Sequence, residues 1–374
     1  MKKLKVMTIV GTRPELIRLS EIIRFCDHYF EHTLVHTGQN YDYELNQIFF
    51  DELNIRKPDY YLEVVERNLG QTIGKIIAES YRIMIEVKPD AVLILGDTNS
   101  ALSAIPAKRL KIPIFHMEAG NRSFDQNLPE EINRKIVDHI ADINLPYTEH
   151  ARRNLLSEGI LKEHVFVTGS PMREILTKHR EKIVSSQILK KLQLEEKKYL
   201  LVSAHREENI DNEENFFSLM EAINIVAEHY QLPVIYSTHP RSRDMINKRN
   251  FKFSPLVKNL PPFGFFDYCS LQKKSLCVLS DSGTLAEECS MLDFPAVSIR
   301  TSTERPEAID KGNMVIGGIT KEGILQATEL AIEMARNGFK STDVSNYSDD
   351  NVAKKIIKVI QSYTAVVNQM VWRK

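Results

Sequence analysis

Short apolar runs alternate with longer amphipathic stretches along the 374-residue chain. The runs are rich in Val, Ile and Leu, as buried strands are, whereas the stretches between them repeat apolar residues at helical spacing, as in Ile73–Ile85 and Phe217–Ala227. The expected strands are Lys5–Val10, Thr33–Thr37, Ala91–Leu95, Ile112–Met117, Ile143–Leu145, Val165–Thr168, Tyr199–Ser203, Val234–Ser237, Leu256–Leu260, Leu276–Ser280, Ala296–Ile299 and Met314–Ile316. This alternation predicts an α/β protein with parallel sheets that are covered on both faces.

The strands fall into two series, which predicts two doubly wound, Rossmann-like domains. A Gly-Ser-Pro step at 169–171 separates the series, so the expected domains are residues 1–169 and 170–351. Apolar residues at helical spacing in 352–374 predict a final helix that completes the first domain. Ligands of open α/β sheets bind beyond the carboxyl ends of the strands, so we expect the site in the cleft between the domains.

Composition narrows the class of protein. Apolar residues make up 43% and charged residues 26%, which is typical of a soluble globular protein. Lys and Arg total 49 against 50 for Asp and Glu, so no basic excess favours a nucleic-acid or membrane partner. No apolar run approaches the ~20 residues of a membrane helix. The four cysteines lack C-x-x-C spacing and are expected as buried, reduced thiols of a cytoplasmic protein.

Charged residues follow the first strands. Pro14 suits the first turn of a helix, which places Arg13 at a helix N-terminus, where an anion binds readily. The alternative is a surface arginine in a tight turn. Asp97 follows the third strand and either caps the next helix or takes part in chemistry.

Three further acidic residues follow the next strand. Glu118 comes directly after it. Glu130 and Glu131 either simply open a helix whose dipole favours acids, or Glu130 converges with Asp97 and Glu118 on one edge of the cleft. Carboxylates that cluster in a cleft raise one another's pKa, as proton-transfer groups require.

The second series has its own polar strand ends. His205 follows its first strand, and His239 and Arg241 follow its second; structural histidines are the alternative interpretation. The turn at Ser282-Gly283 suits a phosphate.

Two more side chains complete this second set. Glu288, one turn beyond the Ser282-Gly283 turn, suits ribose hydroxyls, and Arg305 adds a cation before a proline.

The motifs that are missing also restrict the chemistry. The chain has no G-x-G-x-x-G fingerprint and no Walker A loop, and Gly70–Lys75 lies within a helical pattern. It has no H-E-x-x-H, no paired cysteines and no Asp-x-Asp. We therefore expect neither NAD nor a bound metal.

Taken together and in order, six motifs resemble the non-hydrolysing UDP-N-acetylglucosamine 2-epimerase family over nearly the whole chain. They are Gly11–Glu15, Gly96–Thr98, His116–Gly120, Pro129–Arg134, Asp281–Gly283 and Glu304–Glu307. The resemblance implies a GT-B fold, a homodimer, and C2 epimerisation of a UDP-sugar by elimination of UDP to a 2-acetamidoglycal and re-addition.

Three stretches look most like one branch of the family. His36–Tyr43, Gly120–Asn127 and Pro262–Tyr268 resemble enzymes that convert UDP-2-acetamido-2,6-dideoxy-L-talose to UDP-N-acetyl-L-fucosamine for capsule or O-antigen synthesis. One departure supports this branch: relatives acting on UDP-N-acetylglucosamine carry Lys where this chain has Arg18. A guanidinium keeps its proton, so Arg18 binds charge but is a poor proton shuttle.

The resemblance also assigns roles. Asp97, Glu118 and Glu130 match the acid–base positions, and Arg13, His205, Ser282 and Arg305 match the positions that hold the diphosphate. The remaining expected contacts to UDP and sugar are Arg18, Glu131, His239, Arg241, Tyr268, Gly283 and Glu288.

Three other functions stay open at this point. The same site suits UDP-N-acetylglucosamine and its manno epimer, the fold suits a GT-B glycosyltransferase, and a catalytically silent sensor would bind UDP without exchange.

Overall fold

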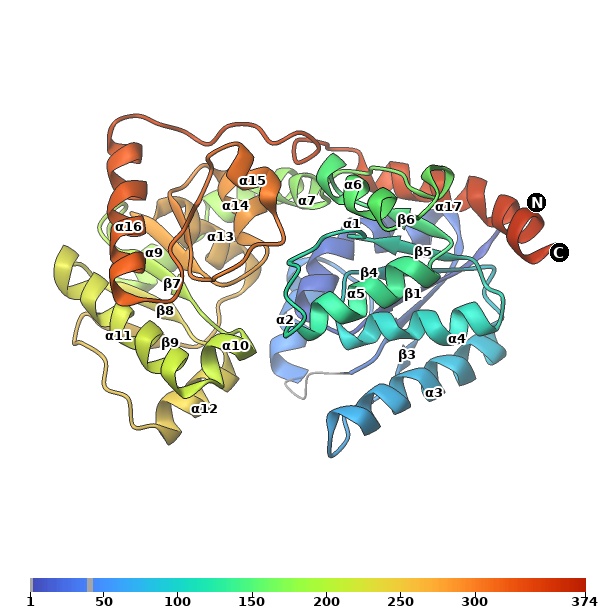
Figure 1. The fold of residues 1–374 in the computed structure, drawn as a ribbon, viewed down its shortest axis with the longest axis horizontal. Helices are drawn as coiled ribbons and strands as arrows, with labels where there is room; N and C mark the ends of the chain where they lie inside the picture. The colour runs from blue at the N-terminus through green and yellow to red at the C-terminus, as the bar shows by residue number, and fades with distance from the viewer. Residues whose placement is uncertain (1–2, 39–42) are drawn as a thin grey trace. The chain divides into compact units, whose positions relative to one another are not determined.

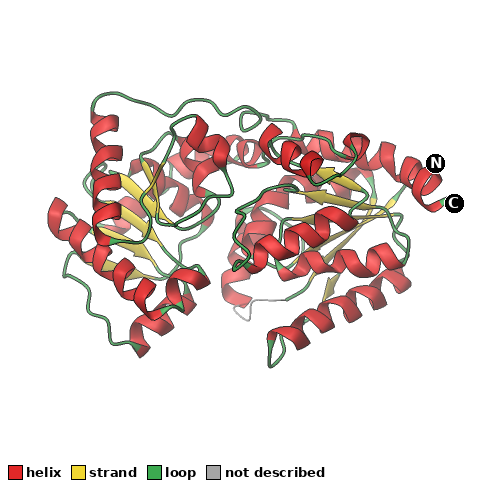
Figure 2. Ribbon diagram, in the orientation of Figure 1, coloured by secondary structure: helices red, strands yellow, loops and turns green. Residues whose placement is uncertain are grey.

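The computed structural model describes residues 3–38 and 43–374. Residues 39–42, which form part of the His36–Tyr43 stretch of the branch resemblance, lie outside the described residues. The chain folds into two compact units, Met1–Thr177 with Ser345–Lys374, and Lys178–Val344. Each unit contains one sheet between layers of helices (Figures 1 and 2).

The sheet of the first unit has six parallel strands in the order β3-β2-β1-β4-β5-β6. Its strands are β1 (Lys5–Val10), β2 (Glu31–His36), β3 (Tyr60–Tyr61), β4 (Ala91–Leu95), β5 (Ile114–Met117) and β6 (Ile143–Leu145). From β1 to β3 successive strands are added towards one edge of the sheet, and from β4 to β6 they are added towards the other, so the winding reverses between β1 and β4. This reversal is the switch point at which doubly wound sheets bind ligands.

Helices cover both faces of this sheet. Side chains of α3 (Leu69–Val87), α4 (Ala104–Arg109) and α5 (Pro129–Ile140) share one apolar core with Met7 and Ile9 of β1. On the other face, α1 (Arg13–Tyr29) packs against α17 (Val352–Val367), so the C-terminal helix belongs to the first unit (Figure 1). The remaining elements are α2 (Tyr43–Glu52), η1 (Asn99–Ser103), α6 (Glu149–Ser157), η2 (Lys162–His164), α7 (Met172–Lys178) and the π-helical turn η3 (Asn368–Trp372).

The second unit repeats this plan with the order β12-β11-β10-β7-β8-β9, which places its switch point between β7 and β10. Its strands are β7 (Leu200–Ser203), β8 (Val234–Ser237), β9 (Val257–Leu260), β10 (Cys277–Ser280), β11 (Ala296–Ser298) and β12 (Val315–Ile316). Its helices are α8 (Arg180–Val184), α9 (Ile188–Leu192), α10 (Glu207–Ile210), α11 (Glu213–Tyr230), α12 (Pro240–Lys248), α13 (Phe265–Lys274), α14 (Leu285–Leu292), α15 (Pro306–Asp310) and α16 (Lys321–Arg336).

Alternate residues of β7 face opposite layers, as side chains on a pleated strand must. Leu200 and Val202 pack in the core formed with α11 and α16, whereas Leu201 packs in the core formed with α13 and α14. Both faces of the strand are therefore buried, which explains its continuous apolar run.

Two expectations about strands are wrong. Val165–Thr168 is not a strand, although Val165 forms one bridge to Asn144 and the N–H of Thr168 bonds to the carbonyl of Pro146. Pro146 has no N–H, so it cannot extend the ladder beyond β6. The sequence also missed β3, a two-residue edge strand.

Two other expectations concern membranes and thiols. In the described part of the chain, no helix is long and apolar enough to cross a membrane. Cys26, Cys269, Cys277 and Cys289 are all free and buried, as predicted.

Candidate active site

The loops after β1 and β4 flank the switch point of the first sheet. The first loop leads into α1, which begins at Arg13 and has Pro14 in its first turn, as the sequence predicts. The Arg13 guanidinium lies 5.3 Å from the centre of the Phe49 ring. Asp97 follows β4 and keeps 14% of its side chain exposed. A cation at a helix N-terminus and a carboxylate thus stand on neighbouring loops.

Two carboxylates and two arginines form a cluster in the first unit, which we call the carboxylate–arginine cluster: Asp97, Glu118, Arg18 and Arg134. Nη2 of Arg134 binds Oδ2 of Asp97 and lies 3.5 Å from Oε1 of Glu118. Nη1 of Arg18 binds Oε2 of Glu118. The cluster therefore holds two positive and two negative charges, with Arg134 between the two carboxylates.

Glu118 has an unusual backbone conformation. Its φ of 59° lies in the left-handed region, which non-glycine residues rarely adopt. Gly120, two residues later, has φ of 79°, and a Cβ there would lie 2.3 Å from the carbonyl oxygen of Ala151. The turn after β5 thus requires glycine at position 120.

A buried charge network holds this turn in place. Asp138 accepts hydrogen bonds from the Gly120 N–H, and its oxygens lie 2.7 Å from Nη1 of Arg122 and 2.9 Å from Nδ1 of His116. Nε2 of His116 donates to the carbonyl of Gly96, 2.7 Å away. Burial raises the pKa of Asp138, but the His116 ring and the Arg122 charge outweigh burial and lower it.

Glu130 and Glu131 both lie in the first turn of α5 but differ in environment. Glu131 is buried, accepts from the N–H of Ser123 at 2.8 Å, and lies 3.1 Å from Nζ of Lys135. Glu130 is half-buried, and the described residues show no hydrogen bond or ion pair for it. The contacts thus join Asp97 and Glu118 through Arg134, whereas Glu130 stands outside that cluster.

In the second unit, a histidine–carboxylate pair flanks the switch point. Nδ1 of His205 lies 3.1 Å from Oδ1 of Asp281, and Oδ2 accepts from the N–H groups of His205 and Arg206 at 2.8 and 2.9 Å. Burial raises the pKa of Asp281, but the charge and hydrogen bond of His205 outweigh burial and lower it to about 2. The His205 side chain is 38% exposed, so Asp281 holds an imidazole ring that solvent or a ligand can reach.

The turn after β10 carries the predicted phosphate site. The hydroxyl of Ser282 lies 2.9 Å from that of Thr284 and accepts from the Thr284 N–H. A Cβ at Gly283 would meet only Nη2 of Arg206, at 3.7 Å. The helix α14 begins at Leu285 and bears Glu288, which is buried and accepts from Nε2 of Gln272.

His239 and Arg241 start α12. The His239 ring centre lies 5.9 Å from that of His205, so these two predicted residues lie side by side. Nδ1 of His239 accepts from the Arg241 N–H, which caps the helix. The guanidinium of Arg241 binds Glu207 and Asp211.

Tyr268 and Arg305 are the last two predicted residues. Tyr268 of α13 is half-buried and packs against the core on its side of the sheet. Arg305 is 2% exposed, and its Nη2 lies 3.4 Å from Oε2 of Glu287 on α14.

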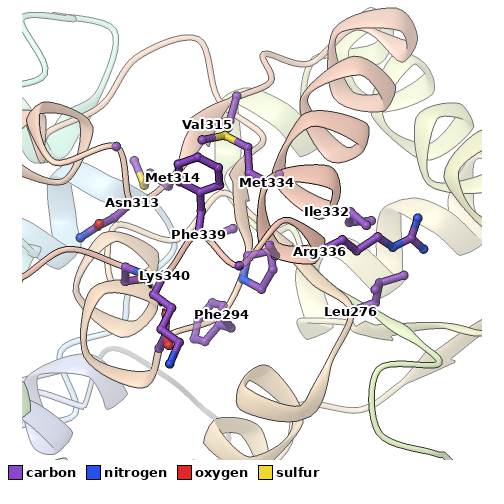
Figure 3. A pocket seen from close by; sticks show the side chains of 18 of the residues that line it. Leu276, Phe294, Asn313, Met314, Val315, Ile332, Met334, Arg336, Phe339 and Lys340 are labelled. Carbon is purple, nitrogen blue, oxygen red and sulfur yellow. Dashed lines mark hydrogen bonds between the residues drawn. The ribbon is translucent and has the colours of Figure 1, made fainter.

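A cavity of about 530 Å³ in the second unit lies away from these residues. It opens near the amino ends of β10, β11 and β12, between them and the end of α16 (Figure 3). Phe294, Met314 and Phe339 contribute apolar walls, and none of the predicted site residues lines it. Since ligands of such sheets bind beyond the carboxyl ends, this cavity is not the candidate active site.

Sequence reasoning missed several residues that shape the site. Asp281 and Arg134 lie inside the family motifs Asp281–Gly283 and Pro129–Arg134, yet their partners are distant in the chain. Glu15 is a third case, because its carboxylate accepts from the N–H of Thr12 at the start of α1. The T-x-x-E spacing of a helix N-terminus was the available signal for Glu15.

Two parallel sheets with the same strand order and a polar cluster at each switch point define a GT-B-type fold built of two Rossmann-like units. The chain belongs to the UDP-N-acetylglucosamine 2-epimerase family, whose sequence model matches residues 25–361.

Two solved structures and one further relative show how close the similarity is. The UDP-N-acetylglucosamine 2-epimerase of Rickettsia bellii is 46% identical, with a TM-score of 0.91 and 100% of both chains covered. The Methanocaldococcus jannaschii enzyme, solved in complex with UDP-GlcNAc and UDP, is 33% identical with a TM-score of 0.89, covering 96% of this chain and 99% of that one. The UDP-2,3-diacetamido-2,3-dideoxy-D-glucuronate 2-epimerase of Pseudomonas aeruginosa is 32% identical over 88% of this chain and 92% of its own.

The chain is accordingly an isomerase that epimerises C2 of UDP-amino sugars.

Proposed function

We propose that this enzyme interconverts UDP-2-acetamido-2,6-dideoxy-L-talose and UDP-N-acetyl-L-fucosamine, in capsule or O-antigen synthesis. The observation that carries the proposal is the buried pair of Arg18 and Glu118. The family resemblance implies Lys at this place in relatives that act on UDP-N-acetylglucosamine, whereas a guanidinium is a poor proton shuttle. The different cation at this place supports a different sugar.

The proposed reaction breaks and remakes the bond between sugar and nucleotide. The C2 hydrogen is not next to a carbonyl, so a base removes it while UDP leaves C1; the C2–H electrons form the C1=C2 bond, and the C1–O electrons go to UDP. The reverse addition, with protonation of the opposite face at C2, gives the epimer. Both steps are redox-neutral.

The carboxylate–arginine cluster suits the proton transfers. Asp97 and Glu118 balance Arg18 and Arg134, so the uptake of the C2 proton makes the cluster positive as UDP becomes more negative. Glu130 completes the proposed acid–base set, because it is half-buried on the same helix as Arg134.

The second unit supplies the proposed grip on UDP. The oriented His205 ring, the Ser282 hydroxyl and Arg305 suit the diphosphate. Arg13, at the N-terminus of α1, is a further proposed cation for the diphosphate. Glu288 suits the ribose, and Tyr268 offers an aromatic face.

His239, Arg241, Glu131 and Gly283 complete the proposed substrate contacts. His239 lies beside His205, and Gly283 stands next to Ser282, which supports these two assignments. Glu131 and Arg241 already bind neighbouring side chains, so their proposed role is to shape the site around the substrate.

Deuterium incorporation tests the proposed substrate. We expect the enzyme in deuterated water to label C2 of UDP-N-acetyl-L-fucosamine and to build up the L-talo epimer. The same assay with UDP-N-acetylglucosamine tests the second candidate, which the Methanocaldococcus jannaschii complex favours. Faster exchange of UDP-N-acetylglucosamine would overturn the proposed substrate.

We also propose that the reaction needs no NAD, because elimination and re-addition are redox-neutral, and no metal, because Arg13, Arg305 and His205 are the proposed partners of the leaving diphosphate. Exchange after dialysis against a chelator, without added nucleotide cofactor, should keep its full rate. We propose a cytoplasmic homodimer as the working form; light scattering should give twice the mass of one chain.

A further inference from the structure

Glu15 is a buried carboxylate at the switch point of the first sheet, with 2% of its surface exposed. Oε2 accepts hydrogen bonds from the N–H groups of Gly11 and Thr12, the latter at 2.7 Å. Oε1 accepts from the hydroxyls of Thr98 and Ser100, at 2.6 and 2.7 Å. Gly11, Thr12 and Thr98 belong to the loops that follow β1 and β4, and Ser100 lies in η1, which begins directly after the second loop.

These two loops carry two residues of the candidate site. Arg13 directly follows Thr12, and Asp97 directly precedes Thr98. Each oxygen of Glu15 binds a different loop, so the side chain joins the segment before Arg13 to the segment after Asp97. The donors occupy both oxygens, and the carboxylate itself is buried.

Because Glu15 is buried, the loss of its hydrogen bonds costs free energy. Desolvation raises the pKa of Glu15, and the bonds from Thr98, Ser100 and the two backbone groups act against that rise. A buried carboxyl that loses its donors pays the full cost of desolvation, so movement of either loop away from Glu15 is unfavourable.

The second unit uses a similar device at its own switch point. Asp281 on the loop after β10 accepts from the N–H groups of His205 and Arg206 on the loop after β7. Each unit thus has one buried acidic side chain that joins the two loops at the switch point. In the second unit this side chain also orients His205.

We propose that Glu15 is a positioning residue, which fixes the distance between Arg13 and Asp97 so that one substrate meets both at once. The inference rests on the proposed function, in which Arg13 binds the diphosphate on C1 and Asp97 exchanges the proton on C2. Elimination requires both groups to act in the same step, and small displacements of either cost rate steeply.

Two substitutions separate positioning from charge. Glu15→Ala removes all four hydrogen bonds. Glu15→Gln keeps them, because its oxygen accepts from the two backbone N–H groups while its amide donates to the hydroxyls of Thr98 and Ser100, which then act as acceptors.

We expect kcat for C2 exchange to fall about 10²-fold in Glu15→Ala and less than about tenfold in Glu15→Gln, with KM changed far less than kcat. The assay uses the UDP-sugar that the wild-type enzyme turns over fastest. Glu174→Gln is the matched control, because Glu174 also accepts a backbone N–H, from Ala353, and burial also raises its pKa. This control should keep wild-type kcat.

Two results would overturn the inference. One is a kcat for Glu15→Ala within about threefold of wild type; the other is an equal loss in Glu15→Gln, since the charge itself would then act. If Glu15→Ala does not fold, the double variant Thr98→Val/Ser100→Ala decides, because it removes only the hydroxyl half of the link. It should lower kcat, and an unchanged kcat would again overturn the inference.

A parallel Asp97→Asn assay separates this inference from the proposed function. Near-normal exchange by Asp97→Asn would contradict the acid–base role of Asp97, whereas only the Glu15 and hydroxyl variants decide whether Glu15 positions the loops.

Discussion

The guanidinium of Arg18 on α1 binds the carboxylate of Glu118 at the end of β5, 100 residues further along the chain. Both side chains are at most 7% exposed, so the pair is shielded from water. Removing one partner of a buried ion pair costs up to about 3–5 kcal/mol when the remaining charge has no other partner. Without Arg18, Glu118 would keep only Arg134, 3.5 Å away, as a compensating cation. The electrostatic environment of the Glu118 carboxylate therefore depends on Arg18.

Arg18→Met should lower C2 exchange by about 10²-fold or more, because Glu118 then lacks its nearest cation. Arg18→Lys should lose less, since it restores the charge at a single point. Arg24→Met is the matched control on the same helix, because Arg24 is 57% exposed and pairs with Glu21. Equal rates for Arg18→Met and Arg24→Met would contradict the assigned role of the pair.

Asp97→Asn, Glu118→Gln and Glu130→Gln should each bind UDP and lose about 10²- to 10⁴-fold in C2 exchange. Calorimetric titration with UDP and deuterium incorporation measure the two effects separately. Glu149→Gln is the control, because Glu149 lies in the first turn of α6 as Glu130 does in that of α5. If all three variants keep near-normal exchange, the acid–base assignment is wrong.

Asp281 should stabilise the protein in a pH-dependent way. Its pKa is lowered from 3.8 to about 2 in the folded protein, so its contribution is complete above about pH 4 and disappears as the pH falls towards 2. The shift corresponds to roughly 2 kcal/mol.

Urea unfolding of Asp281→Asn at several pH values checks this prediction. The gap in unfolding free energy between wild type and variant should shrink between pH 5 and about pH 3. Asp244→Asn, at an exposed position of α12, is the control. A gap that does not vary with pH would contradict the ion pair with His205.

Gly120→Ala should destabilise the first unit and abolish exchange. Its φ of 79° is unfavourable for alanine, and the added Cβ would lie 2.3 Å from the Ala151 carbonyl oxygen. Gly159→Ala isolates the effect of the unfavourable φ, because Gly159 has φ of 86° and an added Cβ there would meet no neighbouring atom. Thermal unfolding should show a loss of about 1–2 kcal/mol for Gly159→Ala and clearly more for Gly120→Ala.

The apolar runs predicted most strands because both faces of each sheet are buried, which leaves little room for polar residues. The prediction of a strand at Val165–Thr168 was wrong, although this run is also apolar. Its pairing depends on Pro146, a residue of the neighbouring segment that has no N–H to donate. The apolar pattern of one segment does not show whether the neighbouring segment has the backbone N–H groups needed to pair with it.

The site could be predicted as far as single positions at strand ends. Asp97 and Glu118 follow β4 and β5, and the fold brings them together as reasoning about strand ends expects. The arginines that form ion pairs with these two carboxylates were not predictable, because the packing of α1 and α5 brings Arg18 and Arg134 next to them. The T-x-x-E spacing indicates the place of Glu15 at a helix start, but its bond to Ser100 was not predictable, since Ser100 lies 85 residues away.

The central claim is that the enzyme breaks the bond between C1 of the sugar and the bridging oxygen of UDP. The most direct measurement follows an ¹⁸O label in that bridging position during turnover. Our account predicts that the label moves into the non-bridging oxygens of the β-phosphate as the epimer forms. Epimerisation with the label still entirely in the bridge would contradict it.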